Sequence, residues 1–207
     1  MYEIDNQGEL PTLNRLTGKI VLCGDGGVGK TSLRKAYLGQ EFNSNYLETL
    51  GADFATKIIK ILYDKEEFQI KYLIWDLAGQ PNFNSVRTNY FKGSHAILII
   101  YDVTNKKSYE NVLNWIEEIK KSLSREGIPP ISLLGNKIDL VNEKTVDDYI
   151  TPSEGIKLSE QISSNYFDQK IDIPYIETSA KTGENVEKAF QILSRQLVKN
   201  YLDNIDE

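Results

Sequence analysis

Short apolar runs of strand length alternate along this chain with longer segments of helical periodicity. The runs are Lys19–Cys23, Phe54–Tyr63, Phe68–Trp75, Ala96–Val103, Ile131–Leu134 and Tyr175–Glu177. Such alternation is typical of α/β proteins. Only the four residues Asp64–Glu67 separate the second and third runs, which predicts an antiparallel hairpin. The longer connections elsewhere predict parallel strands joined by crossover helices.

Two amphipathic helices are marked by apolar residues at three- and four-residue spacing. The first stripe is Tyr109, Val112, Ile116, Ile119 and Leu123, and the second is Val186, Phe190, Leu193 and Leu197. Trp115 lies in the first of these segments, where we expect it to pack in the core. A further helix is expected from Lys30. We expect one domain over residues 17–201, an N-terminal extension over 1–16 and an acidic tail over 202–207.

Composition supports an ordinary globular domain, with 207 residues, 40% hydrophobic and 26% charged. No stretch approaches the roughly 18 consecutive apolar residues that a membrane span needs. The acidic, polar N-terminus does not resemble a secretory signal, and we expect a cytoplasmic protein. The formal net charge of −6 argues against nucleic-acid binding.

Two rare residue types limit the possible chemistry. Cys23 is the single cysteine, which fits a reducing compartment, and its apolar neighbours predict a buried small hydrophobe. His95 is the only histidine, which argues against a histidine-based metal cluster or catalytic triad.

The segment Gly24–Thr31, G-D-G-G-V-G-K-T, matches G-x-x-x-x-G-K-[ST] between a predicted strand and helix. Its glycines let backbone N–H groups wrap around phosphates, and the following helix adds a favourable dipole. Lys30 would supply positive charge to the β- and γ-phosphates, and the Thr31 hydroxyl would bind magnesium. The expected nucleotide contacts are Asp25, Gly26, Gly27, Val28, Gly29, Lys30, Thr31 and Ser32. The motif predicts a nucleoside triphosphate and leaves the base open.

The segment Asn136-Lys137-Ile138-Asp139 follows a predicted strand and selects the base. The Asp139 carboxylate would accept hydrogen bonds from the ring N–H and exocyclic amine of guanine, whereas adenine would present an acceptor to it. Lys137 would lie along the base, and Asn136 would tie the loops together. An ATP-using P-loop enzyme is the rival interpretation, but it leaves this segment unexplained.

Taken in order, these motifs resemble those of the Ras superfamily of small GTPases, and the Rab branch most closely. The resemblance covers roughly Thr17–Tyr201. Asp76-Leu77-Ala78-Gly79-Gln80 is similar to the family's D-x-x-G-Q element. Thr178-Ser179-Ala180-Lys181 is similar to the last guanine-contacting loop. Leu50–Phe54 is similar to Rab-type sequences beside the switches.

The resemblance implies a P-loop NTPase G domain: a six-stranded, mostly parallel sheet with one antiparallel edge strand and helices on both faces. It also implies a monomeric switch that binds GTP or GDP with Mg²⁺ and hydrolyses GTP. Effector, exchange and activating proteins are the implied partners. Effectors would contact residues around 42–54 and 81–90, with Phe83, Tyr90 and Phe91 as an aromatic patch unless one of them packs in the core.

For the phosphate end of the site, the resemblance implies individual roles. Thr49 would join Thr31 in binding magnesium and would sense the γ-phosphate, and Asp76 would hold the metal through water. The Gly79 N–H would contact the γ-phosphate, and Gln80 would orient the attacking water. The implied catalytic residues are therefore Gln80, Lys30 and Thr49.

For the base, the resemblance implies that Phe42 packs edgewise on guanine, with plain core packing as the alternative. The Ala180 N–H would contact the guanine oxygen, and Ser179 and Lys181 belong to the same loop.

Two features of the switch regions bear on the reaction. No arginine precedes Thr49 in Tyr46–Glu48, so we expect slow intrinsic turnover that needs an activating protein. Pro81 and Asn82 follow Gln80 where the family usually has a glutamate. This change calls the usual exchange mechanism into question and stiffens the loop. A guanine-nucleotide-binding module without hydrolysis therefore remains the alternative.

Two other segments depart from the family pattern. The last residues, 203–207, hold no cysteine and no basic run, which argues against a prenyl anchor unless the native chain extends further. The stretch from Val141 to Ile173 is longer than the usual connection. Its added residues, around 142–149 and 166–171, predict polar surface loops that are either inert or a docking site.

Overall fold

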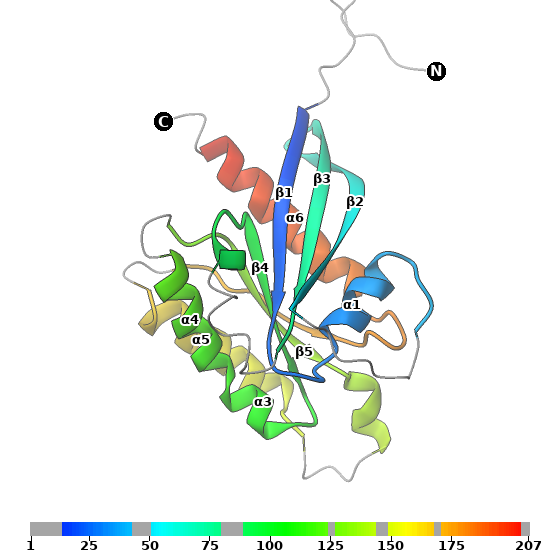
Figure 1. The fold of residues 1–207 in the computed structure, drawn as a ribbon, viewed down its shortest axis with the longest axis vertical. Coiled ribbons are helices and arrows are strands. Elements are labelled where there is room, and N and C mark those ends of the chain that lie inside the picture. The colour runs from blue at the N-terminus through cyan, green and yellow to red at the C-terminus, as the bar shows by residue number, and fades with distance from the viewer. Residues whose placement is uncertain are drawn as a thin grey trace, which may run out of the picture.

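A six-stranded sheet in the order β2-β3-β1-β4-β5-β6 runs through the centre of the computed structural model (Figure 1). The model describes residues 14–42, 51–79, 89–123, 127–143, 149–167 and 171–203. The strands are β1 (Asn14–Cys23), β2 (Ala52–Tyr63), β3 (Glu66–Leu77), β4 (Ala96–Asp102), β5 (Ile131–Asn136) and β6 (Tyr175–Thr178). Edge strand β2 is antiparallel to β3, and every other pair is parallel. The predicted fold class is confirmed.

Helices cover both faces of this sheet. They are α1 (Lys30–Tyr37), α3 (Lys106–Glu110), α4 (Val112–Leu123), α5 (Pro152–Asn165) and α6 (Val186–Asp203), with the short 3₁₀ helix η2 at Ile138–Glu143. The predicted helix around Tyr109–Leu123 is thus divided at Asn111 into α3 and α4. No helix in the described residues has the length and apolar character needed to cross a bilayer.

Alternate residues of β1 show how the two faces are filled, because successive side chains of a strand point to opposite sides. Ile20 and Leu22 pack in a cluster with residues of α1 and α6. Val21 and Cys23 pack with residues of α4 and α5 on the other face. Cys23 is fully buried, as its apolar neighbours predicted.

The β2–β3 hairpin is tighter than the four-residue loop that the sequence predicted. Tyr63 pairs with Glu66, so only Asp64 and Lys65 form the turn. Both have positive φ angles, 47° and 72°, as in the two-residue turns whose twist matches that of the flanking strands.

Two domain boundaries also differ from the sequence prediction. β1 begins at Asn14, inside the expected extension, because it pairs with β3 from Asn14↔Phe68 onward. Helix α6 continues to Asp203, inside the expected acidic tail. Leu16 and Leu202 both pack against the buried cluster between α1, α6 and the sheet, so hydrophobic burial extends the domain at each end.

The stretch expected to carry surface loops contains a helix with strong start signals. Thr151 caps α5 and accepts a hydrogen bond from the Glu154 N–H, while the Glu154 side chain accepts one from the Thr151 N–H. Residues 144–148 and 168–170 lie outside the described part of the chain. Tyr166, Phe167 and Ile171 pack against the cluster under α4 and α5, so the expectation of a purely polar surface loop is wrong there.

Phe190 and Phe54 offer a matched test of this packing. Phe190 is fully buried and stacks on Tyr37 with ring centroids 3.6 Å apart, whereas Phe54 is 57% exposed. Phe190→Ala should lower the free energy of unfolding by about 3 to 5 kcal/mol, because it leaves a cavity. Phe54→Ala should cost less than about 1 kcal/mol. Urea unfolding of both variants under the same conditions measures the difference, and equal losses of stability would contradict the core position of Phe190.

Candidate functional site

The motif residues gather at one edge of the sheet. β1, β3, β4, β5 and β6 run in the same direction, so their carboxyl ends meet there. The glycine-rich loop follows β1, Asp76 lies near the end of β3, and Asn136 and Thr178 end β5 and β6. In open α/β sheets this is the edge where ligands bind.

Gly29 joins the glycine-rich loop to α1. It caps the helix with a φ of 101°, and no side chain caps the helix there. A Cβ at this position would lie 2.4 Å from Nδ2 of Asn136, so only glycine fits both the backbone and the close approach. The helix N–H groups are consequently open to an anion.

Two other glycines of the loop are open to solvent. Gly26 and Gly27 are exposed, and a Cβ at Gly27 would meet nothing within 4 Å. Val28 instead points into the core, where it is 1% exposed. Ser32, in the first turn of α1, is half-buried. The loop therefore has room for phosphate groups beside its backbone.

Lys30 brings a buried positive charge to this loop. Its Nζ donates to the carbonyl oxygens of Gly24 at 2.8 Å and Asp25 at 2.7 Å, and the residue is 6% exposed. The ammonium group thus lies against the loop backbone, within which phosphate groups are expected to bind.

Thr31 and Asp76 form the oxygen pair expected of a magnesium site. The Thr31 hydroxyl donates to Oδ2 of Asp76. Oδ1 of Asp76 is buried and has no hydrogen-bond partner among the described residues. Burial raises the pKa of Asp76, and the Thr31 hydrogen bond and the nearby Lys30 oppose that effect. Mg²⁺ commonly takes one or two carboxylates together with substrate phosphates, and this pair fits that ligand set.

Gly79 brings the end of β3 against the phosphate loop. A Cβ at this position would lie 2.4 Å from the carbonyl carbon of Asp25 and 2.5 Å from the carbonyl oxygen of Gly24. Only a residue without a side chain permits this approach. The backbone of the D-x-x-G element therefore lies directly beside the loop.

Asn136 ties three segments together, as the sequence predicted. Its side chain is fully buried, and Nδ2 donates to the carbonyl of Val28 at 2.8 Å. Its Oδ1 accepts from the Ala180 N–H at 3.1 Å and from the Thr178 hydroxyl at 3.2 Å. The Ala180 N–H expected to face guanine is thus already paired with Asn136 in this structure.

Asp139 is surrounded by the other residues expected to read the base. Its Oδ1 accepts from the Ser179 hydroxyl at 2.6 Å, and its Oδ2 lies 3.7 Å from Nζ of Lys181. The side chain is 12% exposed. Lys137 has a φ of 71° and pairs with Asp102 at 2.8 Å. Asp102, at the end of β4, was not singled out in the sequence.

Of the remaining candidate site residues, the structure describes only Phe42. Phe42 is 45% exposed, so the alternative of plain core packing is wrong. Thr49 and Gln80 lie outside the described residues, as do Pro81 and Asn82.

The expected aromatic patch is only partly exposed. Phe91 is fully buried among residues of α4 and the sheet, so the alternative of core packing is confirmed for this residue and it is not part of a partner-facing patch. The Tyr90 ring is tilted against Trp75 at a centroid distance of 5.5 Å, and Trp75 stacks against the exposed Phe54 at 5.3 Å. Phe83 lies outside the described residues.

Two sets of contacts near the site carry no local sequence signal. Arg34 on α1 pairs with Asp53 on β2 at 2.6 Å, with the Arg34 side chain 8% exposed. Trp115 is 3% exposed, as expected of a core residue, but its Nε1 also donates to the Asp25 carboxylate. Both join residues that only the tertiary fold brings together.

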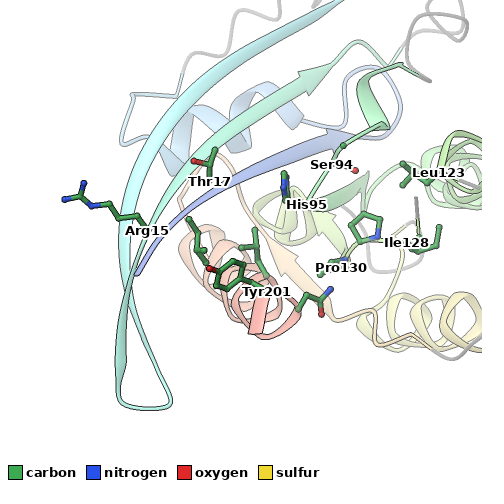
Figure 2. Close-up of a pocket in the computed structure, with 14 residues that line it drawn as sticks. Arg15, Thr17, Ser94, His95, Leu123, Ile128, Pro130 and Tyr201 are labelled. Carbon is green, nitrogen blue, oxygen red and sulfur yellow. The ribbon is translucent and has the colours of Figure 1, made fainter. Parts of the chain in front are cut away.

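A cavity of about 920 Å³ lies at the opposite edge of the sheet (Figure 2). Arg15 and Thr17 border it near the start of β1, His95 and Pro130 just before β4 and β5, and Tyr201 near the end of α6. His95 Nδ1 accepts a hydrogen bond from the Lys19 N–H, and partial burial lowers the pKa of His95. No residue of the motif cluster lines this cavity.

Comparison with known proteins agrees with the motifs. The model of the Ras family matches residues 19–199. Ras-related protein RABG3f of Arabidopsis thaliana is 38% identical over 193 residues, which cover 92% of this chain and 87% of that protein. Ras-related protein Rab7 of Cenchrus ciliaris is 38% identical, with 88% and 82% covered. GTP-binding protein ypt1 of Schizosaccharomyces pombe is 36% identical, with 90% and 82% covered.

Removing the Asn136 side chain tests the link between the loops. Asn136→Ala leaves the buried Val28 carbonyl and Ala180 N–H without this partner, and should lower the free energy of unfolding by about 2 to 4 kcal/mol. The exposed Asn114 provides the control, and Asn114→Ala should cost less than about 0.5 kcal/mol. Urea unfolding measures both values. An Asn136 variant as stable as the control would show that the loops are held in another way.

Proposed function

The chain belongs to the Ras family, in its Rab branch, and on that premise we propose a monomeric, magnesium-dependent switch that hydrolyses GTP slowly. As a member of this family it is a small GTPase that binds guanine nucleotide. The observation that carries the magnesium proposal is the buried Asp76 carboxylate, which receives the Thr31 hydroxyl on one oxygen and has no described partner on the other.

At the phosphates, the described residues bind and stabilise charge. When bound, magnesium supplies positive charge to the β- and γ-phosphate oxygens. Thr31 and Asp76 would hold it, and the Lys30 ammonium would contact the same phosphates. The Gly79 N–H would contact the γ-phosphate. Thr49 and Gln80 are assigned to magnesium binding and water orientation from the resemblance to the family.

We expect slow intrinsic GTP hydrolysis, because the described residues offer no arginine finger to the phosphates. Residues Tyr46–Glu48 contain no arginine. Arg34, one turn after Thr31 on α1, is held by Asp53 at 2.6 Å and is not positioned as a finger on the phosphates. Without an arginine finger, this class of site turns over on the order of 10⁻³ s⁻¹ or more slowly. We therefore propose that an activating protein supplies the missing charge.

At the base, the Asp139 carboxylate would accept hydrogen bonds from guanine. Its orientation is supported by the Ser179 hydroxyl at 2.6 Å, while Lys181 lies 3.7 Å from its other oxygen. Phe42, which is 45% exposed, would pack edgewise against the ring. Lys137 would lie along the base with its ammonium on Asp102.

We assign effector binding to the surface formed by Phe54, Trp75 and Tyr90. Trp75 stacks on Phe54 and contacts the tilted ring of Tyr90, which links residues of the two segments expected to bind effectors, and Phe54 is 57% exposed. Trp75 and Tyr90 are half-buried beside it, and a partly exposed aromatic cluster is the kind of surface that partner proteins bind. A role in Rab-like vesicle traffic is proposed by analogy with the branch. The single, fully buried cysteine supports a cytoplasmic location.

Single-turnover hydrolysis of GTP with magnesium tests the reaction. The wild-type chain should convert bound GTP to GDP at about 10⁻³ s⁻¹ or more slowly, and Gln80→Leu should be at least about tenfold slower, because it no longer orients water. Unaided turnover near one per second would contradict the need for an activating protein. Tight binding with no hydrolysis in either protein would favour a guanine-nucleotide-binding module.

Base selection is tested with Asp139→Asn. The substitution should weaken GDP binding by about 100-fold or more and shift preference toward xanthosine diphosphate, because an amide presents a donor and an acceptor where the carboxylate accepts twice. Asp64→Asn, an exposed change in the β2–β3 turn, is the matched control and should bind GDP as the wild type does. Titration calorimetry with GDP, XDP and ADP measures the preference. Unchanged GDP affinity would mean that another residue selects guanine.

A further inference from the structure

The Asp25 side chain joins the phosphate loop to the start of α4. Its Oδ1 accepts from the indole Nε1 of Trp115 at 2.9 Å and from Nδ2 of Asn111. Asn111 precedes the first residue of α4, and the Trp115 N–H bonds to its carbonyl. The two donors are therefore one helical turn apart and meet on a single carboxylate oxygen.

The backbone of Asp25 lies against Lys30 and Gly79, the two residues expected to contact the phosphates. The Asp25 carbonyl accepts from Nζ of Lys30 at 2.7 Å. A Cβ on Gly79 would lie 2.4 Å from the Asp25 carbonyl carbon. Asp25 is thus placed between α4 on one side and Lys30 and Gly79 on the other. A displacement of the Asp25 backbone would therefore change the positions of α4, Lys30 and Gly79 relative to one another.

The α4 side of this contact is packed in the core. Trp115 is 3% exposed and packs with Ile116 and Ile119 in the cluster against the sheet. Helix α4 has no acidic residue in its own first turn. The Asp25 carboxylate therefore supplies the negative charge that favours a helix N-terminus, and it does so from another element. The loop, by contrast, has exposed glycines at 26 and 27, whose backbones have few intrinsic restraints.

We propose that Asp25 is a positioning residue for nucleotide retention, whose carboxylate fixes the phosphate loop to α4 through Trp115 and Asn111. The proposal rests on the proposed function, because it concerns how firmly that site holds the phosphates. The anchor keeps Lys30 and the loop N–H groups in the arrangement that the phosphates need. Its loss should speed nucleotide release while base selection, which depends on the distant Asp139, stays unchanged.

The test is the release of a fluorescent GDP analogue from the magnesium-loaded full chain into excess GDP. Asp25→Ala and Trp115→Phe should each release the analogue about tenfold faster than the wild type, because each removes hydrogen bonds to a charged group. Asp25→Asn keeps an acceptor and should lie between them and the wild type. Ser122→Ala is the control, since it removes a side-chain bond to the Glu118 carbonyl elsewhere on α4, and should release at the wild-type rate.

Two further readouts separate positioning from simple stabilisation. The double variant Asp25→Ala/Trp115→Phe should release no faster than Asp25→Ala, because both changes break the same contact. The preference for GDP over ADP should be unchanged in every variant. Trp115→Phe retains most of the buried ring, so it carries the test even where Asp25→Ala does not fold.

Wild-type release rates in both Asp25→Ala and Trp115→Phe would overturn the proposal, even if their unfolding temperatures fell. Simple addition of the two effects would overturn it as well. A wild-type chain that retains no guanine nucleotide would instead show that the proposed function is wrong. Faster release with unaltered base preference and no additivity would support the anchor.

Discussion

One buried amide, that of Asn136, connects the parts of the molecule on which the site depends. It bonds to the phosphate loop at Val28 and to the β6 loop at Thr178 and Ala180. Parallel strands bring these loops to one edge, but strand pairing alone does not determine their spacing. A fully buried side chain must satisfy its polar atoms within the protein, so its three bonds set the distance between the phosphate end and the base end.

Three charged side chains near the phosphate loop are buried and bond to other groups of the protein. Lys30, Arg34 and Asp76 are all nearly or fully buried, and each is costly to bury alone. Lys30 bonds to loop carbonyls and Arg34 to Asp53. Asp76 receives one hydroxyl and retains a buried oxygen without a described partner. This spare acceptor is the reason we propose that Asp76 helps to bind a cation and does not form a structural ion pair.

The two edges of the sheet have different chemistry, because different loops lie at the carboxyl ends and at the amino ends of the parallel strands. At the carboxyl edge, loops carry glycine, asparagine and aspartate, whose backbone and side-chain groups face each other across short distances. At the amino edge, a cavity of about 920 Å³ is bordered by Arg15, His95 and Tyr201, none of which belongs to a nucleotide motif. The motif chemistry described here belongs to the carboxyl edge.

The sequence by itself determined the α/β class and identified the glycine-rich loop and the Asn136–Asp139 segment, because these depend on residue type at short, fixed spacing. Glycine at 29 and lysine at 30 predict a phosphate-binding loop from their local spacing alone, whatever the rest of the fold. Only the tertiary structure decided that Phe91 is buried, that β1 begins at Asn14, and that Trp115 donates to Asp25 across 90 residues of chain. Such contacts depend on which faces the folded sheet and helices bring together, and no local pattern records that choice.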